Sequence, residues 1–315
     1  MTASPWLSVV VPTYRGSRHV ADALGSIERE VASAPGAIEV IVVDDGSDDD
    51  TTTIVATFAD RLPLVTPEPL RRGSWVAAVN DGLALARAPW TCMLHQDDRW
   101  SEGRLSALAP ALQRADAAGV QLVVHGVQMQ DDDGRNVGRW RPPFPPGAVD
   151  AGRATRSLLV QNWVAVPGAT FRTDAARDRR LDDALWYTAD WDLWLHLAAQ
   201  GGVVVAPGTW SVFRLHADSQ TVLGSADRGD FRSQLEAVLA RHRSDLAGAD
   251  ARAARLSLET NVLLAVMAHR GERELRRWLR AAAVSPAAWA TFVKHSRIVE
   301  RSFSRVRAGL ARRPR

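Results

Sequence analysis

The chain has 315 residues, 46% of them hydrophobic and 24% charged, as expected for a globular protein with a sizeable buried core. Its formal net charge is only +3, so we do not expect a nucleic-acid-binding protein. No apolar run reaches the roughly 18 residues of a spanning helix, and the N-terminus lacks the basic start of a signal peptide. The single cysteine, Cys92, excludes an intramolecular disulfide and fits a reducing cytoplasm, where we expect the protein.

Strand-like and helix-like segments alternate through the N-terminal part of the chain. Continuous apolar runs predict buried parallel strands at residues 7–12, 38–43, 62–66 and 90–94. The segments between them have helical composition or spacing, at residues 20–30, 51–60 and 75–87. This alternation predicts an α/β fold with an open, mostly parallel sheet and crossover helices.

The pattern is less regular in the rest of the chain. Residues 120–129 predict another strand, and the turn-rich, Pro-rich residues 131–147 predict a loop over the site. Residues 157–164 and 168–171 are expected to pack as part of the main domain. We then expect a helix at residues 190–200 capped by Gly201–Gly202, two short strands within 202–215, and helices from about Asp227 to the end.

Polar residues follow three of the predicted strands, at Pro12–Tyr14, Asp44–Asp45 and Asp97–Asp98. In open α/β sheets ligands bind beyond the carboxyl ends of the strands, so we expect these groups to converge on one rim. The adjacent carboxylates of Asp97 and Asp98 repel each other, and a divalent cation would make their proximity favourable.

Each acidic pair also has a structural interpretation. Asp97 and Asp98 are placed to cap a helix that starts near Ser101, and the DDGSDDD stretch that begins at Asp44 is good turn chemistry. Both interpretations remain open from the sequence.

Six segments within residues 7–222 resemble, in order, the family 2 glycosyltransferases, which have the GT-A fold. They are SVVVPTYRG, IVVDDGSDDDT, RRGSWVAAVNDGLALA, HQDD, GATFR, and TADWDLWLHLAAQGG followed by FRLHADSQT. The resemblance implies metal-assisted transfer of a sugar, with inversion, from a nucleoside diphosphate to an acceptor hydroxyl. UDP is the favoured nucleotide, with TDP or GDP as alternatives, and the acceptor is a saccharide, a lipid-linked molecule or a natural product.

The resemblance also implies a division of the chain and a donor site. Residues 1–225 would form the GT-A domain, with a nucleotide-binding half (1–100) and an acceptor half (101–225), followed by a helical region with a basic tail (226–315). Asp98 would bind Mg²⁺ or Mn²⁺, with His216 completing the metal shell. The implied nucleotide-binding residues are Pro12, Thr13, Tyr14, Asp44, Asp45, Arg71, Ser74 and Asp97. His95 departs from the family pattern, which has an aspartate there.

Asp190 matches the catalytic carboxylate of the family and would act as the general base. The family usually has an acidic pair here, but the preceding residue is Ala189. Trp191 and Trp163 are expected to bind the acceptor, because aromatic faces pack on sugars. The alternatives are that Asp190 or Asp192 caps the helix, that His216 is an interior histidine, and that the tryptophans are core residues.

The alternative function is a catalytically inactive GT-A-like binding protein or a scaffold at a membrane surface. Its support is the segment 289–315, where apolar residues alternate with arginines as in a basic amphipathic helix. Such a helix would bind the inner face of an anionic membrane peripherally, or else pack on the body of the protein.

Overall fold

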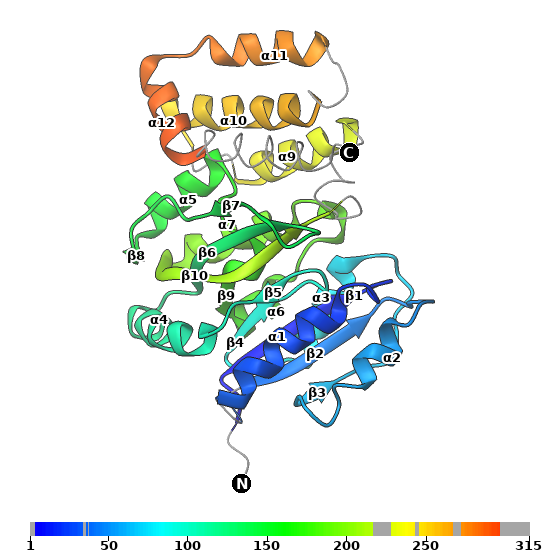
Figure 1. Cartoon of the computed structure of the whole chain (residues 1–315). Helices are drawn as coiled ribbons and strands as arrows, with labels where there is room; N and C mark the ends of the chain where they lie inside the picture. The colour runs from blue at the N-terminus through cyan, green and yellow to red at the C-terminus, as the bar shows by residue number, and fades with distance from the viewer. Residues whose placement is uncertain are drawn as a thin grey trace.

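The computed structural model describes residues 4–33, 36, 38–216, 228–242, 246–266 and 272–296 (Figure 1). Its centre is one mixed sheet with the strand order β3-β2-β1-β4-β9-β6-β10-β5, while β7 pairs with β6 and β8 with β10. The strands are β1 (Leu7–Thr13), β2 (Ile38–Asp44), β3 (Leu64–Val65), β4 (Trp90–Met93), β5 (Arg99–Trp100), β6 (Leu122–Asp131), β7 (Asn136–Trp140), β8 (Gly147–Val149), β9 (Ala169–Arg172) and β10 (Val203–Leu215).

The direction of the strands creates a common rim. β1 runs parallel to β2 and β4, and β2 runs parallel to β3, as the apolar runs predicted. β9 is antiparallel to both β4 and β6, and β10 is parallel to β6. The carboxyl ends of β1, β2, β4, β6 and β10 therefore all lie at one edge of the sheet.

Helices cover both faces of this sheet. Val9 and Val11 of β1 pack in one core with α1 and α4, whereas Val10 packs in another with α3 and α7. This alternation follows from the two-residue period of a strand. The helices of the sheet domain are α1 (Val20–Ser33), α2 (Thr51–Ala56), α3 (Trp75–Leu85), α4 (Arg104–Ala118), α5 (Ala151–Val160), α6 (Thr173–Arg179) and α7 (Ala189–Gly201), with short 3₁₀ helices at Val166–Gly168 and Asp183–Leu185.

A helical layer follows the sheet domain in sequence and stacks beside it in space (Figure 1). It contains α9 (Arg228–His242), α10 (Gly248–Val266), α11 (Glu272–Ala282) and α12 (Pro286–Ser296). Val160 of α5 shares a core with Leu256 of α10 and Phe292 of α12. Phe292 is only 3% exposed, so the described start of the predicted membrane-binding segment packs on the body. Residues 297–315 lie outside the described residues.

None of the described helices is both long enough and apolar enough to cross a lipid bilayer.

Two expectations about the second half of the chain were wrong. Residues 131–147 are not only a loop, because β7 within them pairs antiparallel with β6. Residues 203–215 form the single strand β10, which stays paired with β6 through register shifts between Val205 and Ser211. The Pro207–Gly208 pair lies within this irregularity. Gly202 caps α7 with φ of 86°, as predicted for the glycine pair.

Candidate active site

The three predicted groups of polar residues meet at the carboxyl rim. The backbone N–H of Asp45 donates to the carbonyl of Thr13 at 2.8 Å, which joins the ends of β1 and β2. The side chain of Gln96 makes two hydrogen bonds to the backbone of Tyr14, accepting at 2.8 Å and donating at 2.9 Å. The loop after β4 is thereby fastened to the loop after β1, and the predicted convergence is confirmed.

Asp44 and Asp45 both organise this rim, and each is 7% exposed. The Asp44 carboxylate accepts four hydrogen bonds, from the hydroxyls of Thr13 and Ser47 and from the N–H groups of Gly46 and Ser47. This is the turn chemistry that its sequence context allowed. The Asp45 carboxylate accepts from the N–H groups of Arg72 and Ser74, at 2.7 and 2.8 Å. Asp45 therefore holds the segment that leads into α3.

The other predicted donor-site residues lie around this turn. Pro12 is buried in β1, while Tyr14 is 47% exposed. Ser74 is the N-cap of α3 and accepts a hydrogen bond from the N–H of Ala77 at 3.2 Å. Arg71 is exposed, and its stem lies against Gly46, where an added Cβ would be 2.8 Å from the Arg71 Cγ. The start of α3 thus presents a helix N-terminus beside a cationic side chain, an arrangement that favours anions.

The two adjacent carboxylates after β4 have different surroundings. The Nε2 atom of His216 lies 2.8 Å from Oδ2 of Asp97. Oδ1 of Asp98 accepts from the backbone N–H of Arg214 at 3.0 Å. Oδ2 of Asp98 is buried and has no hydrogen-bond partner among the described residues. The sequence interpretation paired His216 with Asp98, whereas in the structure His216 pairs with Asp97.

The pKa values of the two carboxyl groups diverge. Burial and the neighbouring charge of Asp97 raise the pKa of Asp98 well above its usual range. Burial is the largest single influence on Asp97 and opposes its ionisation, but the hydrogen bond to His216, together with the nearby imidazoles and the backbone, lowers the pKa of Asp97 overall. Asp97 is therefore the ionised member of the pair, and a nearby cation would relieve the cost of ionising Asp98.

A histidine replaces the first carboxylate of the family motif. The ring of His95 packs edge-on against Trp75, with 5.2 Å between the centroids, and its Nε2 is buried without a hydrogen-bond partner in the described part of the chain. Burial lowers the pKa of His95, so the imidazole is neutral at neutral pH. This position contributes no carboxylate to the rim.

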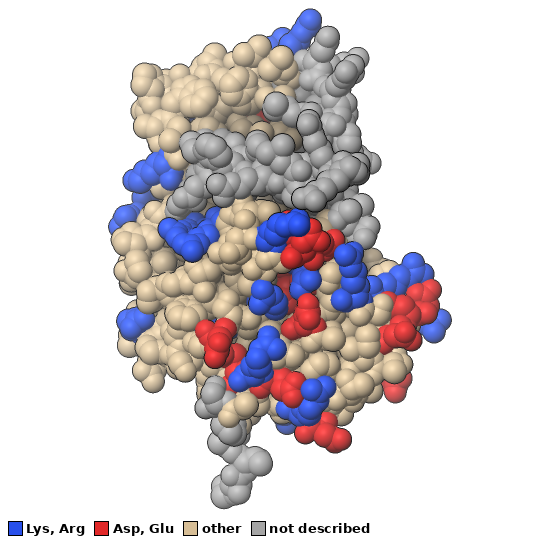
Figure 2. Space-filling model, viewed as in Figure 1, with Lys and Arg blue, Asp and Glu red and all other residues tan. Residues whose placement is uncertain are grey.

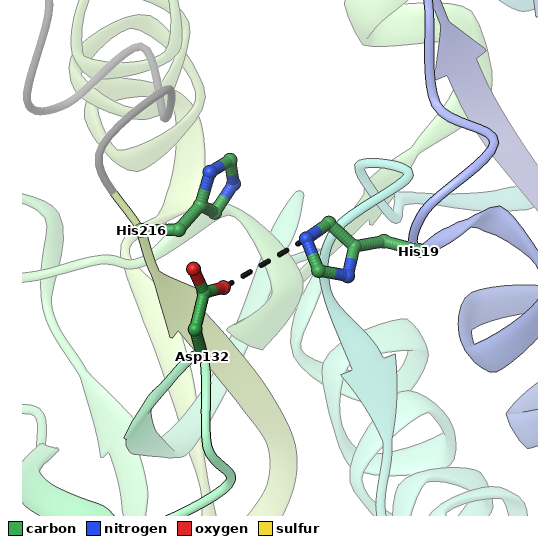
Figure 3. Close-up of side chains that lie close together, drawn as sticks. All are labelled: His19, Asp132 and His216. Atoms are coloured by element: carbon green, nitrogen blue, oxygen red, sulfur yellow. Dashed lines mark ion pairs between the residues drawn. The ribbon is translucent and has the colours of Figure 1, made fainter.

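His216 also belongs to a second group of possible ligands (Figure 3). Ligand atoms of His19, Asp132 and His216 all lie within 4.8 Å of one another. The Nε2 of His19 and Oδ1 of Asp132 are buried, 3.8 Å apart, and neither has a hydrogen-bond partner among the described residues. Unsatisfied nitrogen and oxygen atoms at such spacing fit a divalent cation, and the imidazoles suit Mn²⁺ better than Mg²⁺.

Asp190 lies in the first turn of α7, whose N-cap is Thr188, so the alternative that Asp190 caps the helix was wrong. The Nδ2 of Asn162 donates to its Oδ2 at 3.3 Å. Burial raises the pKa of Asp190 to about 6, although hydrogen bonds from the Trp191 backbone and from Asn162 oppose the shift. A carboxylate whose pKa lies near neutral pH is suited to general-base catalysis.

Both tryptophans predicted to bind the acceptor are core residues. Trp191 is 5% exposed, and its indole N–H donates to the carbonyl of Leu158 at 2.9 Å. Trp163 is 2% exposed and packs edge-on against Phe144. Neither indole presents an open face to a sugar, which agrees with the alternative that these residues contribute packing.

A groove of about 570 Å³ lies between α1, β5 and the β6–β7 hairpin, and Asp190 is not among its lining residues. Arg29, Arg99 and Arg139 line it, together with polar side chains such as Gln128 and Gln130. Acidic and basic side chains are interspersed on the face of the sheet domain that Figure 2 shows. That face therefore lacks the continuous positive potential that would attract a polyanion.

An open α/β sheet whose strand ends meet at one polar rim is the arrangement of the GT-A fold glycosyltransferases, and the comparisons with known proteins agree on that class. The structure of Staphylococcus aureus TarS residues 1–349 in complex with UDP-GlcNAc aligns with a TM-score of 0.65 at 19% identity, covering 95% of this chain and 91% of that 1–349 chain. The mannosyltransferase PcManGT of Pyrobaculum calidifontis, in complex with GDP-Man and Mn²⁺, aligns with a TM-score of 0.53 at 18% identity, covering 98% and 87% of the two chains. At these identities the likeness concerns the fold.

Residues 8–164 match the model of glycosyl transferase family 2, and the chain belongs to that family. An uncharacterized glycosyltransferase of Rickettsia typhi is 25% identical over 224 residues, which are 70% of this chain and 67% of the relative.

Four residues of the site were not among those predicted: Gln96, Asn162, His19 and Asp132. Gln96 lies inside the acidic motif, and its position between His95 and Asp97 was the available signal. The others come from separate connections of the chain. Asp132 lies in residues 131–147, the predicted loop over the site, but nothing in the local sequence marked it, His19 or Asn162 individually.

Proposed function

We propose that this glycosyltransferase transfers a sugar from a nucleoside-diphosphate donor, with UDP as the first choice, to an acceptor hydroxyl with inversion at the anomeric carbon. The observation that carries the proposal is the hydrogen-bonded rim where the ends of β1, β2 and β4 meet, with the Asp97–His216 pair beside it. Such a rim is where open α/β sheets bind nucleotides.

The donor would lie across this rim. The exposed ring of Tyr14 is available to stack on the base, and Thr13 and Asp45 shape the turn beneath it. The N-terminus of α3 and Arg71 would contact the phosphates. Asp97 and His216 would hold a divalent ion, Mn²⁺ or Mg²⁺, with the buried Asp98 adding negative charge behind them. When bound, that ion would neutralise the charge that develops on the diphosphate leaving group.

The acceptor step would be assigned to Asp190. Its carboxylate would remove the proton of the acceptor hydroxyl while Asn162 holds Oδ2 in place. The acceptor oxygen would bond to the anomeric carbon as the bond to the diphosphate breaks on the opposite face. The diphosphate would leave with the bonding electron pair, and the configuration would invert.

The structural neighbours support the donor class. TarS has been crystallised with UDP-GlcNAc and PcManGT with GDP-Man and Mn²⁺. We extend to this chain only the shared chemistry, a nucleoside-diphosphate sugar with a divalent ion. The acceptor is proposed as a saccharide, a lipid-linked molecule or a natural product, and the arginine-rich sequence of residues 297–315 suits contact with an anionic membrane.

The test is a pair of measurements on the full chain. Calorimetry with UDP-, TDP- and GDP-sugars, with and without Mn²⁺, should give Mn²⁺-dependent binding that is tightest for a UDP-sugar. Hydrolysis or transfer of the bound donor should then be lost in Asp190→Asn while binding persists. Absence of binding for every nucleotide would overturn the donor proposal, and normal turnover in Asp190→Asn would overturn the base assignment.

A further inference from the structure

His19, Asp132 and His216 come from three different connections that meet at the rim. His19 immediately precedes α1, Asp132 follows β6, and His216 follows β10. Figure 3 shows the side chains of His19 and Asp132 pointing toward each other, with the ring of His216 beside them. The rings of His19 and His216 are 5.2 Å apart between centroids.

Two of these ligand atoms are buried and unsatisfied. The His19 side chain is 10% exposed, and its Nε2 faces Oδ1 of Asp132 at 3.8 Å, which is too long for a hydrogen bond. Burying two such atoms without partners costs free energy. A metal ion about 2.0–2.2 Å from each would satisfy both atoms at close to the observed spacing.

The neighbouring arginines do not contact the two unsatisfied ligand atoms. Arg18 lies at 3.3 Å from the other oxygen of Asp132, Oδ2. Arg214, which is close to His19, is engaged by Asp22 at 2.9 Å and by the carbonyl of Asp97 at 3.0 Å. Neither arginine contacts Nε2 of His19 or Oδ1 of Asp132, and both atoms stay without a hydrogen-bond partner among the described residues.

We propose that His19, Asp132 and His216 form a binding site for one divalent transition-metal ion, such as Mn²⁺, Co²⁺ or Zn²⁺, in the absence of nucleotide. Two imidazoles and one carboxylate are ligands that such ions accept and that Mg²⁺ disfavours. The site ties the loop of Tyr14, just before α1, to the β6–β7 hairpin.

The inferred site shares His216 with the Asp97–His216 pair, so a single ion occupies one position or the other. The ion would sit on His19 and Asp132 before the donor arrives, and on Asp97 with the diphosphate afterwards. This last step rests on the proposed function, whereas binding without nucleotide does not.

The test measures metal binding rather than activity. The metal-free full chain, without nucleotide, is titrated with Mn²⁺ followed by electron paramagnetic resonance, and with Zn²⁺ followed by calorimetry. We expect about one ion per chain, with little competition from Mg²⁺. Asp132→Asn and His19→Gln should each weaken binding by about tenfold or more. Asp133→Asn is the matched control, because Asp133 is exposed in the same turn and pairs with Arg135.

Asp97→Asn separates the two positions. Because Asp97 contacts His216 but is not a ligand of the inferred site, the variant should keep nucleotide-free binding within a few-fold of wild type and lose the Mn²⁺-dependent gain in affinity for UDP. Unchanged binding in Asp132→Asn, or loss of nucleotide-free binding in Asp97→Asn, would overturn the inferred site. Should His19→Gln fail to fold, as judged by circular dichroism, Asp132→Asn decides alone. Failure of the proposed function would show differently, as intact metal binding with no nucleotide binding.

Discussion

The imidazole of His216 and the carboxylate of Asp97 lie 2.8 Å apart, Nε2 to Oδ2, although 119 positions separate them in the sequence. The contact joins the end of β10 to the loop after β4. It is the largest of the interactions that lower the pKa of Asp97 against the effect of burial, and it places a nitrogen and an oxygen ligand beside the buried Asp98.

The first prediction concerns this pair. Asp97→Asn and His216→Ala should each weaken Mn²⁺-dependent binding of UDP by about tenfold or more, because each removes a ligand from the ion that would bridge the protein and the diphosphate. Calorimetry with and without Mn²⁺ measures the effect. His196→Ala is the control, since His196 lies on α7 and contacts Gln200. Equal UDP affinity in wild type and both variants would contradict the assignment.

The second prediction concerns the pH dependence of transfer. The pKa of Asp190 is raised to about 6, chiefly by burial, so the base is deprotonated only above that pH. We expect kcat/KM to rise as pH increases from about 5 to 7 and then to level off. Asp190→Asn should lower kcat by about 10²–10⁴-fold with little change in UDP affinity. A profile that is flat across this range would speak against Asp190 as the base.

The third prediction follows from the same pKa by linkage. The pKa of Asp190 is about 6 in the folded protein, above the ordinary value of 3.8. The protonated carboxyl group therefore stabilises the folded state relative to the ionised group. This stabilisation is complete below pH 3.8 and is lost as the pH rises through about 6. Near pH 7.5 the ionised group costs up to about 3 kcal/mol. Asp190→Asn should therefore melt at a higher temperature than wild type at pH 7.5, and the difference should shrink toward pH 4. Asp174→Asn, at an exposed carboxylate, should show no such trend.

The sequence predicted the parts of the fold where one physical signal dominates. β1 and β2 are buried along their whole length, so their continuous apolar runs were sufficient. β7 escaped prediction because it is a side strand paired only with β6, with one buried residue, Val137, between exposed or partly exposed neighbours. The Pro- and Gly-rich residues on either side of it are typical of a loop, and this pattern was stronger than that of the strand.

The sequence predicted that the polar groups would meet at the rim, but it did not predict which side chains contact each other there. Adjacent residues leaving a strand point in different directions, and the sequence does not show which of Asp97 and Asp98 turns toward His216. In the structure the backbone N–H of Arg214 donates to one oxygen of Asp98, Oδ1, while Asp97 faces His216. His19 and Asp132 meet only through tertiary structure, so no local spacing marked them.

The fourth prediction concerns Asp192, which fastens the helical layer to the sheet domain. Its carboxylate is 1% exposed and contacts Arg179 of α6 at 2.6 Å, and Arg241 and His242 of α9 at 3.0 and 2.9 Å. Asp192→Asn removes the carboxylate charge that faces Arg179, while Arg241 keeps its ion pair with Asp182 at 2.7 Å, and should destabilise the protein by about 3 kcal/mol. Urea denaturation measures this loss. Asp178→Asn, at an exposed position of α6, is the control. Wild-type stability in Asp192→Asn would show that the helical layer docks without this contact.

The fifth prediction separates packing from acceptor binding at Trp191, the neighbour of Asp190. The indole is buried, and its N–H donates to Leu158, so its contribution should be to stability. Trp191→Phe keeps most of the ring volume and should cost about 1 kcal/mol for the lost hydrogen bond, with the acceptor KM unchanged. Trp191→Ala should cost about 3–5 kcal/mol because it leaves a cavity beneath the N-terminus of α7. Denaturant melts and acceptor titrations of both variants distinguish the two roles. A raised acceptor KM in Trp191→Phe at unchanged stability would mean that the indole does contact the acceptor, and that α7 moves to expose it.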